Sequence, residues 1–337
     1  MRRASTLLLA ASLLLGASAC SGSSSEGEPA PSTTAPEATT TTLDPADPAS
    51  VPVDPSPGCG TEPDVARVDP DAAPGDVELA FTSGGTERVY RVGVPAAYEP
   101  DEAAPLIVNL HGSGSNAVQA SAYSDLPRRA AERGMLTVAP EAIGGRWELA
   151  GEGADGDFLI ELVDDLEGRY CIDRNRVHLA GMSLGAWKAA ATACSFDGRF
   201  ASLGLVTVEV FPGDCDPISV VAFHGRADFT VPYGEGGTVD PSGSPNEGVT
   251  GTLANIASWA ENAGCDPDPV VERIGGDVED RRYGGCDLGL DVQLYTIDEG
   301  GHTWPGAAIE IGATTQTIDA TDLILDWFEA HPRRTER

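Results

Sequence analysis

The sequence is short of basic side chains. Its 337 residues include 53 acidic and only 21 basic ones, for a formal net charge of −32, and Lys188 is the single lysine. A field of that sign repels phosphate backbones and anionic bilayer surfaces. The charge therefore excludes nucleic acid as a partner, and it excludes a membrane association held by basic side chains.

Long apolar runs are also missing. No stretch reaches the roughly 20 consecutive apolar residues that a membrane-spanning helix needs. A shorter apolar run, Leu7 to Leu15, follows the basic head Met1-Arg2-Arg3 and precedes Gly16-Ala17-Ser18-Ala19-Cys20. This order is typical of a secretory signal. We expect residues 1–19 to be removed, Cys20 to carry a lipid, and the protein to face outward from the cell membrane; plain secretion is the alternative.

Large apolar side chains are scarce from residue 20 to residue 57. The segment consists mainly of Ser, Thr, Pro, Glu and Ala, and such a composition cannot bury enough surface to offset the entropy of ordering. We therefore predict a disordered tether over 20–57. Residues 58–337 are numerous enough to form one large domain.

No Cys-x-x-Cys pair occurs, which argues against a zinc site of that kind. Six cysteines follow the tether, and an even number in an exported chain favours disulfides, although six cysteines allow 15 connectivities. Proximity in the sequence favours Cys194–Cys215 and Cys265–Cys286, and leaves Cys59–Cys171 by elimination.

Short apolar runs alternate with helical patterns along the predicted domain. Strands are predicted at 77–81, 89–94, 105–110, 135–139, 176–181, 201–208, 218–223 and 291–297, and helices near 121–133, 155–169, 184–194, 250–262 and 316–330. The alternation predicts an α/β fold with a mostly parallel sheet covered by helices on both faces. The segments 233–249 and 273–289 show no clear pattern.

One strand runs directly into Gly181-Met182-Ser183-Leu184-Gly185, and a helical pattern follows. The motif Gly-x-Ser-x-Gly at a strand-to-helix junction is the nucleophile elbow of α/β-hydrolases, in which a sharp turn exposes the serine hydroxyl. The pentapeptide alone is a weak signal, but its position between a strand and a helix makes it specific. Ser183 is the predicted nucleophile.

A serine nucleophile needs a base and an acid that orients the base. In this fold the order along the chain is serine, acid, histidine. Asp228 follows the predicted strand 218–223, and His302 follows the last strand within a glycine-rich loop. We predict the triad Ser183, Asp228 and His302. Two other histidines are assigned to structure, His178 to the core and His224 to bracing the Asp228 loop.

The stretch His111-Gly112-Ser113-Gly114 follows an early buried strand. Backbone N–H groups at this position, together with that of Leu184, can bind the oxyanion of a tetrahedral intermediate. We assign Ser113 N–H as the second donor, with Gly112 as the alternative. Trp147 and Trp304 lie beside predicted site loops and are candidates for stacking on the substrate, although packing in the core explains them equally well.

Taken together, these motifs resemble the family of polyhydroxybutyrate depolymerases and feruloyl esterases over about residues 75–330. The resemblance is carried by His111-Gly-Ser-Gly114, Tyr170-Cys-Ile-Asp-x-x-Arg-Val177, Gly-Met-Ser183-Leu-Gly, His224-Gly-x-Ala-Asp228-x-x-Val-Pro-Tyr233 and Gly-Gly-His302-Thr-Trp-Pro-Gly. It implies an α/β-hydrolase fold, the triad named above and hydrolysis of carboxylic esters. The sequence departs from the family pattern at Ala186, where a second glycine is common.

The predicted function is hydrolysis of carboxylic esters through an acyl-enzyme, with hydroxyalkanoate oligomers, small esters or esters of plant polysaccharides as substrates. We expect no cofactor, no metal and no obligate protein partner, and we expect contact with a membrane only through the N-terminal lipid. Two alternatives remain open. One is a serine peptidase on the same fold, and the other is an envelope lipoprotein that binds its ligand without catalysis.

Overall fold

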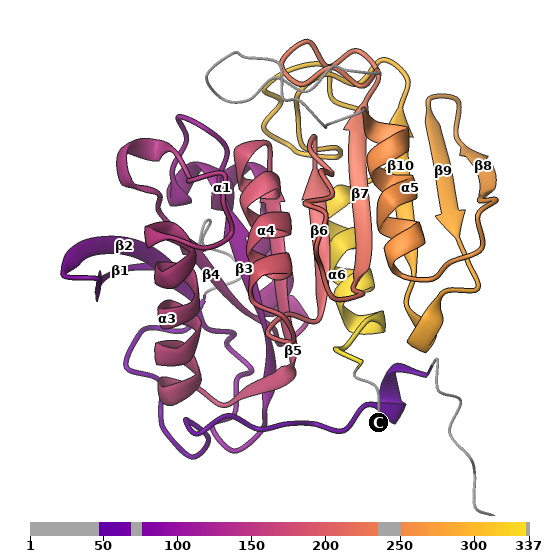
Figure 1. The fold of residues 1–337 in the computed structure, drawn as a ribbon. Helices are drawn as coiled ribbons and strands as arrows, with labels where there is room; N and C mark the ends of the chain where they lie inside the picture. Colours follow the sequence, from indigo (N-terminus) through magenta and orange to yellow (C-terminus); the bar gives the residue numbers. More distant parts are fainter. Residues whose placement is uncertain (1–46, 69–75, 235–250, 335–337) are drawn as a thin grey trace, which may run out of the picture. The chain divides into compact units, whose positions relative to one another are not determined.

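The structure is a computed structural model that describes residues 47–68, 76–234 and 251–334. In this part of the chain, ten strands form one sheet in the order β1-β2-β4-β3-β5-β6-β7-β10-β9-β8 (Figure 1). All neighbours from β4 to β10 are parallel, and an antiparallel pair of strands extends the sheet at each side. The predicted mostly parallel sheet is confirmed.

The strands of the parallel centre are almost entirely buried, as expected where both faces of a sheet are covered. Their bounds are β3 Ala104–Leu110, β4 Leu136–Pro140, β5 Ile172–Met182, β6 Ser202–Val206, β7 Ser219–Gly225 and β10 Val292–Ile297. The outer strands are β1 Val77–Ser83, β2 Thr86–Gly93, β8 Val270–Ile274 and β9 Val278–Tyr283.

Helices cover both faces of the sheet. One apolar core lies between the sheet and α3 (Ala154–Arg169), α4 (Leu184–Ser195) and α5 (Thr252–Asn262), which lie in front of the strands in Figure 1. A second core lies on the opposite face, under α1 (Ala117–Ser124), α2 (Leu126–Glu132) and α6 (Ala320–Ala330). Alternate residues of one strand enter opposite cores, as Val220 and Val221 of β7 do.

Two predicted elements differ from the structure. The helix expected at 121–133 is two helices, because Asp125 adopts the left-handed conformation (φ 52°) and Pro127 lies in the first turn of the next helix. The segment 273–289 contains most of an antiparallel pair, β8 and β9, that the sequence pattern did not indicate. β8 is exposed along nearly its whole length, so the alternation of apolar and polar residues that identifies a half-buried strand is absent.

Three disulfides join the predicted pairs Cys59–Cys171, Cys194–Cys215 and Cys265–Cys286. The first of them holds the N-terminal segment against the start of β5. There, Ser56 N–H donates to Ile172 O (2.9 Å), and the buried Ser56 hydroxyl donates to Tyr170 O (2.6 Å).

This contact corrects the predicted boundary of the tether. Residues 47–57 belong to the described structure, with a short helical turn at Pro48–Ser50 and an antiparallel bridge between Pro55 and Asp173. The segment lacks large apolar side chains, so its composition predicts disorder. It is held instead by backbone hydrogen bonds and by the nearby disulfide of Cys59, and hydrophobic content does not report such contacts. The predicted signal, Cys20 and the tether up to residue 46 lie outside the described residues.

Candidate active site

Ser183 lies at the sharp turn between β5 and α4, at the carboxyl edge of the parallel sheet. Its backbone has φ 58° and ψ −124°, a conformation that a residue with a side chain rarely adopts and that persists only where the surroundings enforce it. The turn brings the Ser183 N–H to the Val206 carbonyl (2.9 Å) on neighbouring β6.

The two glycines of the motif are needed because backbone segments touch at this turn. A Cβ at Gly185 would lie 2.0 Å from the Leu110 carbonyl oxygen, and a Cβ at Gly181 would lie 2.5 Å from the Gly185 carbonyl carbon. α4 can therefore begin directly against the end of β3. The elbow predicted from the sequence has the expected backbone geometry.

Asp228 lies on the loop after β7 and is held by several donors. Its Oδ1 accepts hydrogen bonds from the N–H groups of Thr230 (2.8 Å) and Val231 (2.9 Å), and its Oδ2 accepts one from His302 Nδ1 (2.7 Å). Burial alone would raise the pKa of Asp228, but the contacts with His224, His302 and the backbone outweigh burial and hold this pKa well below its usual range. The carboxylate is therefore ionised at neutral pH.

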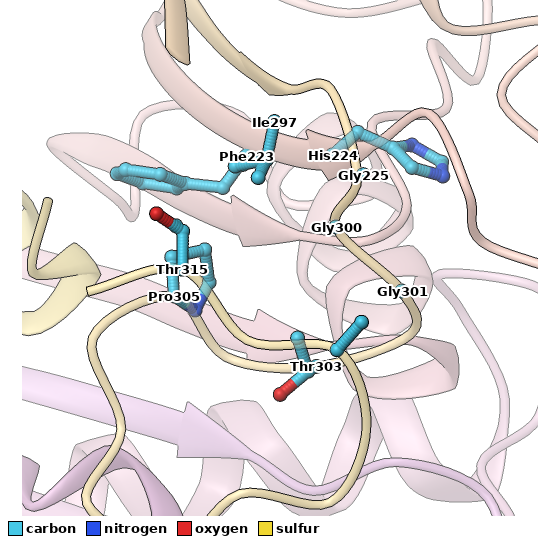
Figure 2. Close-up of a pocket in the computed structure, with 10 residues that line it drawn as sticks. Phe223, His224, Gly225, Ile297, Gly300, Gly301, Thr303, Pro305 and Thr315 are labelled. Carbon is cyan, nitrogen blue, oxygen red and sulfur yellow. The ribbon is translucent and has the colours of Figure 1, made fainter. Parts of the chain in front are cut away.

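His302 follows β10, and close packing of two backbones brings it to Asp228. A Cβ at Gly225 would lie 2.1 Å from the Gly300 carbonyl oxygen, and Ala227 N–H donates to that oxygen (2.9 Å). Figure 2 shows this approach of Gly225 and Gly300 beside a small cavity behind the histidine loop. Because Nδ1 of His302 is bonded to Asp228, Nε2 is the ring nitrogen left for chemistry.

Ser183 and His302 line the same cavity, which has a volume of about 450 Å³. Its other lining residues come from the loop after β3, from α1, from the end of β5 and from the loop after His302. They are Gly112, Ser113, Gly114, Ser115, Gln119, Ala122, Tyr123, Met182, Ile309 and Ile311. None of these side chains carries a charge at neutral pH, so among the described residues His302 is the lining side chain that can become a cation.

The loop of the predicted oxyanion donors borders Ser183. A Cβ at Gly112 would lie 3.4 Å from Ser183 Cβ, so these two backbones are neighbours. The N–H groups of Gly114 and Ser115 donate to the carbonyls of Gly145 and Gly112. The N–H groups of Ser113 and Leu184 have no acceptor within the described part of the chain, which leaves them available to a ligand, whereas that of Gly112 faces the Tyr123 hydroxyl.

His111 and Trp147 support this loop from behind. His111 is buried, its Nδ1–H donates to Gly112 O (2.8 Å), and its Nε2 accepts from Ala142 N–H (3.1 Å). Burial lowers the pKa of His111, which keeps the ring in the neutral form that this pair of contacts requires. Trp147 donates from Nε1 to the His111 carbonyl (2.9 Å).

Of the two readings of Trp147 and Trp304, substrate stacking and packing in the core, the structure fits packing in the core. Both are buried, at 4% and 1% exposure, and neither lines the cavity. Trp147 packs on the His111 ring, and Trp304 packs on Tyr123 and donates to the Thr321 hydroxyl. Both indoles therefore shape the site from the core, where their N–H groups find acceptors.

Five residues that line the cavity lie outside the motifs found in the sequence: Gln119, Ala122, Tyr123, Ile309 and Ile311. Tyr123 of α1 and the half-exposed Ile309 and Ile311 reach the cavity, although none belongs to a recognised motif. The two isoleucines lie in a loop without regular structure. Two apolar residues two positions apart in a glycine-rich loop were the only signal that the sequence offered.

The two histidines assigned to structure are buried as predicted. His178 stacks on Phe328, with Nδ1 2.9 Å from the Ser202 hydroxyl, and burial lowers its pKa to about 3. His224 lies beneath the Asp228 loop. Among the described residues no group of three or more His, Cys, Asp or Glu side chains is arranged to hold a metal ion, and no helix is long and apolar enough to cross a bilayer.

Comparison with known proteins agrees with this geometry. A family model described as "Esterase PHB depolymerase" matches residues 90–234. The chain is 28% identical over 277 residues to NocK of Nocardia uniformis subsp. tsuyamanensis, which is named as an esterase (72% of this chain, 80% of that protein). It is 25% identical over 289 residues to feruloyl esterase C of Emericella nidulans (82% of this chain, 91% of that protein).

A solved structure of an acetyl xylan esterase from Aspergillus awamori superimposes with a TM-score of 0.52 at 15% identity, covering 75% of this chain and 99% of that one. At this identity the likeness establishes the fold alone. The parallel sheet, the covering helices and this likeness together identify the α/β-hydrolase fold.

Proposed function

We propose that the chain, which is similar to polyhydroxybutyrate depolymerases and feruloyl esterases, is a serine carboxylesterase that hydrolyses uncharged carboxylic esters through Ser183, His302 and Asp228. The observation that carries the proposal is the meeting of three separate loops at one edge of the sheet. Ser183 and His302 line one cavity, and His302 is bonded to Asp228 at 2.7 Å.

The proposed reaction has two halves. His302 Nε2 takes the Ser183 proton as Oγ attacks the ester carbonyl, while Asp228 holds the Nδ1–H and stabilises the imidazolium. The oxyanion is bound by the N–H groups of Leu184 and Ser113, with Gly112 as the alternative second donor. The alcohol leaves with the proton from His302. A water molecule, activated by the same ring, then hydrolyses the acyl-enzyme.

The cavity lining supports an uncharged substrate. Ile309, Ile311 and Met182 supply apolar surface, and Tyr123 adds an aromatic ring. Since no arginine or lysine is among the described lining residues, a carboxylate or phosphate on the substrate would be desolvated without a partner. Hydroxyalkanoate oligomers, small esters and the acyl esters of plant polysaccharides fit this requirement.

Replacement of the nucleophile tests the mechanism. We expect Ser183→Ala to abolish turnover of p-nitrophenyl acetate and butyrate, because removal of a triad nucleophile typically costs about 10⁶ in kcat. The thermal midpoint should change little. Ser258→Ala in α5, whose hydroxyl donates to Ala254 O within the same helix, is the matched control and should retain full turnover.

Retention of ester turnover by Ser183→Ala would refute the assignment. A fluorophosphonate probe should label the wild-type protein and leave Ser183→Ala unlabelled. A panel of uncharged esters, esters with a carboxylate on the acyl group and peptide p-nitroanilides then tests the substrate class. Faster hydrolysis of the anilides would favour the peptidase alternative.

We also propose that the protein is exported and anchored by a lipid on Cys20. The proposal rests on the N-terminal sequence and on the three disulfides, which are typical of oxidising compartments outside the cytosol. Residues 58–337, with the segment 47–57 packed on them, would form the single catalytic domain.

A further inference from the structure

A buried pair of ionisable side chains lies directly behind Asp228. Glu209, in the segment after β6, and His224, near the end of β7, are 2% and 1% exposed. Glu209 Oε2 lies 2.7 Å from His224 Nδ1. Figure 2 shows His224 and its neighbour Phe223 pointing to opposite sides of β7, so His224 faces away from the core of α6.

The contacts of the His224 ring define its protonation. Nε2 lies 2.9 Å from the Val231 carbonyl, which can only accept a hydrogen bond, so Nε2 carries a proton. Nδ1 faces the Glu209 carboxylate and the Thr252 hydroxyl (3.0 Å). Burial alone would lower the pKa of His224, but Glu209 and Asp228 outweigh burial and raise this pKa to about 10. The ring is therefore an imidazolium with Glu209 as its counter-ion.

The imidazolium is connected to the proposed triad in two ways. Its Nε2 lies 3.6 Å from Asp228 Oδ2, the same oxygen that accepts the hydrogen bond from His302. It also bonds the carbonyl of Val231, whose N–H donates to Asp228 Oδ1. Charges thus alternate from Glu209 through His224 to Asp228, and His302 is the last member of the row.

The other polar groups around Glu209 and His224 do not supply a second positive charge next to Asp228. On α5, Asn255 is 3.4 Å from Glu209 Oε1 and is uncharged. The Tyr233 ring stands edge-on to His224, and its hydroxyl bonds Thr296 of β10. Arg226 stacks on the outer side of Tyr233 and is paired with Glu279 and Asp298 near the surface.

We propose that Glu209 and His224 are positioning residues for the proposed esterase mechanism, in which the His224 imidazolium fixes the Asp228 loop and offsets part of the Asp228 charge at His302. A carboxylate with no other cation nearby raises the pKa of a bonded histidine. A base whose pKa is too high stays protonated at neutral pH and cannot accept the serine proton. The His224 imidazolium, 3.6 Å from the Asp228 oxygen that accepts the His302 N–H, offsets part of the negative charge that His302 faces.

The proposal is tested by Glu209→Gln, a substitution of nearly equal shape that removes the counter-ion. His224 then becomes neutral but keeps its Nε2–H on Val231. Because a positive charge near His302 is lost, the midpoint of the acidic limb of kcat/KM should move to higher pH by about 0.5–1 unit. The profile is measured by pH-stat titration with an uncharged ester. Glu209→Asp keeps a carboxylate beside His224, so its acidic limb should stay close to that of the wild-type protein.

Asn255→Ala is the matched control, because it removes a contact to Glu209 and leaves every charge in place. It should lower the thermal midpoint without moving the acidic limb. A Glu209→Gln protein that is less stable but has the wild-type limb would overturn the proposal, since the pair would then serve packing alone.

A measurement on the unaltered protein covers the case in which Glu209→Gln fails to fold. In ¹⁵N-labelled wild-type protein at neutral pH, both His224 ring nitrogens should show the chemical shifts of protonated nitrogens. A singly protonated His224 ring would overturn the proposal. This result does not depend on ester turnover, so it is distinguishable from a failure of the proposed function, which Ser183→Ala tests.

Discussion

At the scale of single residues, the His224 ion pair makes stability depend on pH. The pKa of His224 is raised from 6.5 to about 10 in the folded protein. Its contribution to the free energy of unfolding is therefore fully present below about pH 6.5, the unfolded value, and is lost as the pH rises to about 10. For one proton the loss is at most about 1.4 kcal/mol per pH unit.

Denaturant unfolding of the wild-type protein and Glu209→Gln, compared across this range, measures that loss. The difference in unfolding free energy should shrink as the pH rises. Lys188, whose pKa is lowered to about 8 by burial, contributes with the opposite sign but is present in both proteins and cancels. A difference that stays constant with pH would mean that His224 is neutral in the fold.

The sequence identifies a functional residue when the role of that residue also requires particular residue types next to it in the chain. Ser183 needs glycines on both sides, so its motif is visible. Glu209 occupies an irregular segment, and nothing along the chain reveals that it meets His224. The roles of Trp147 and Trp304 stayed undecided for a similar reason, because position beside a site loop does not say whether a ring faces the cavity or the core.

At the scale of elements, the junction of β3, β5 and α4 depends on the absence of side chains. A Cβ at Gly185 would lie 2.0 Å from the Leu110 carbonyl oxygen, which cannot move without displacing β3. We expect Gly185→Ala to destabilise the fold by about 3 kcal/mol or more and to disrupt ester turnover. Soluble yield and thermal midpoint provide the measurement.

Gly168 in α3 is the matched control for this prediction. It is exposed, its backbone is helical, and a Cβ added there would meet no other atom within 4 Å. Gly168→Ala should be neutral or stabilising by about 0.5 kcal/mol, because alanine restricts the unfolded chain. Equal effects of the two substitutions would contradict the close packing at the elbow.

The elements of the parallel centre were predictable because burial on both faces leaves continuous apolar runs. β8 and β9 were not, because their side chains are largely polar or exposed. The break between α1 and α2 was missed because the apolar pattern continues through Asp125, whose left-handed backbone the pattern does not report. Periodicity records burial, and it says little about strands at the edge of a sheet.

At the scale of the whole molecule, the net charge of −32 bears on the proposed membrane location. An acidic body is repelled by anionic lipid headgroups, so the acyl chains on Cys20 would supply the only attraction. Such binding is hydrophobic and does not weaken with salt. We therefore expect the protein to sediment with membranes, to resist a high-salt wash and to be released by detergent.

The Cys20→Ser variant tests this prediction, because it removes the lipid attachment site and leaves the folded domain unchanged. It should appear in the soluble fraction outside the cell, with wild-type ester turnover and its three disulfides intact. Release of the wild-type protein by salt would show that charges hold it to the membrane. Retention of Cys20→Ser in the detergent-released fraction would show that another segment anchors it. Either result would exclude Cys20 as the sole anchor.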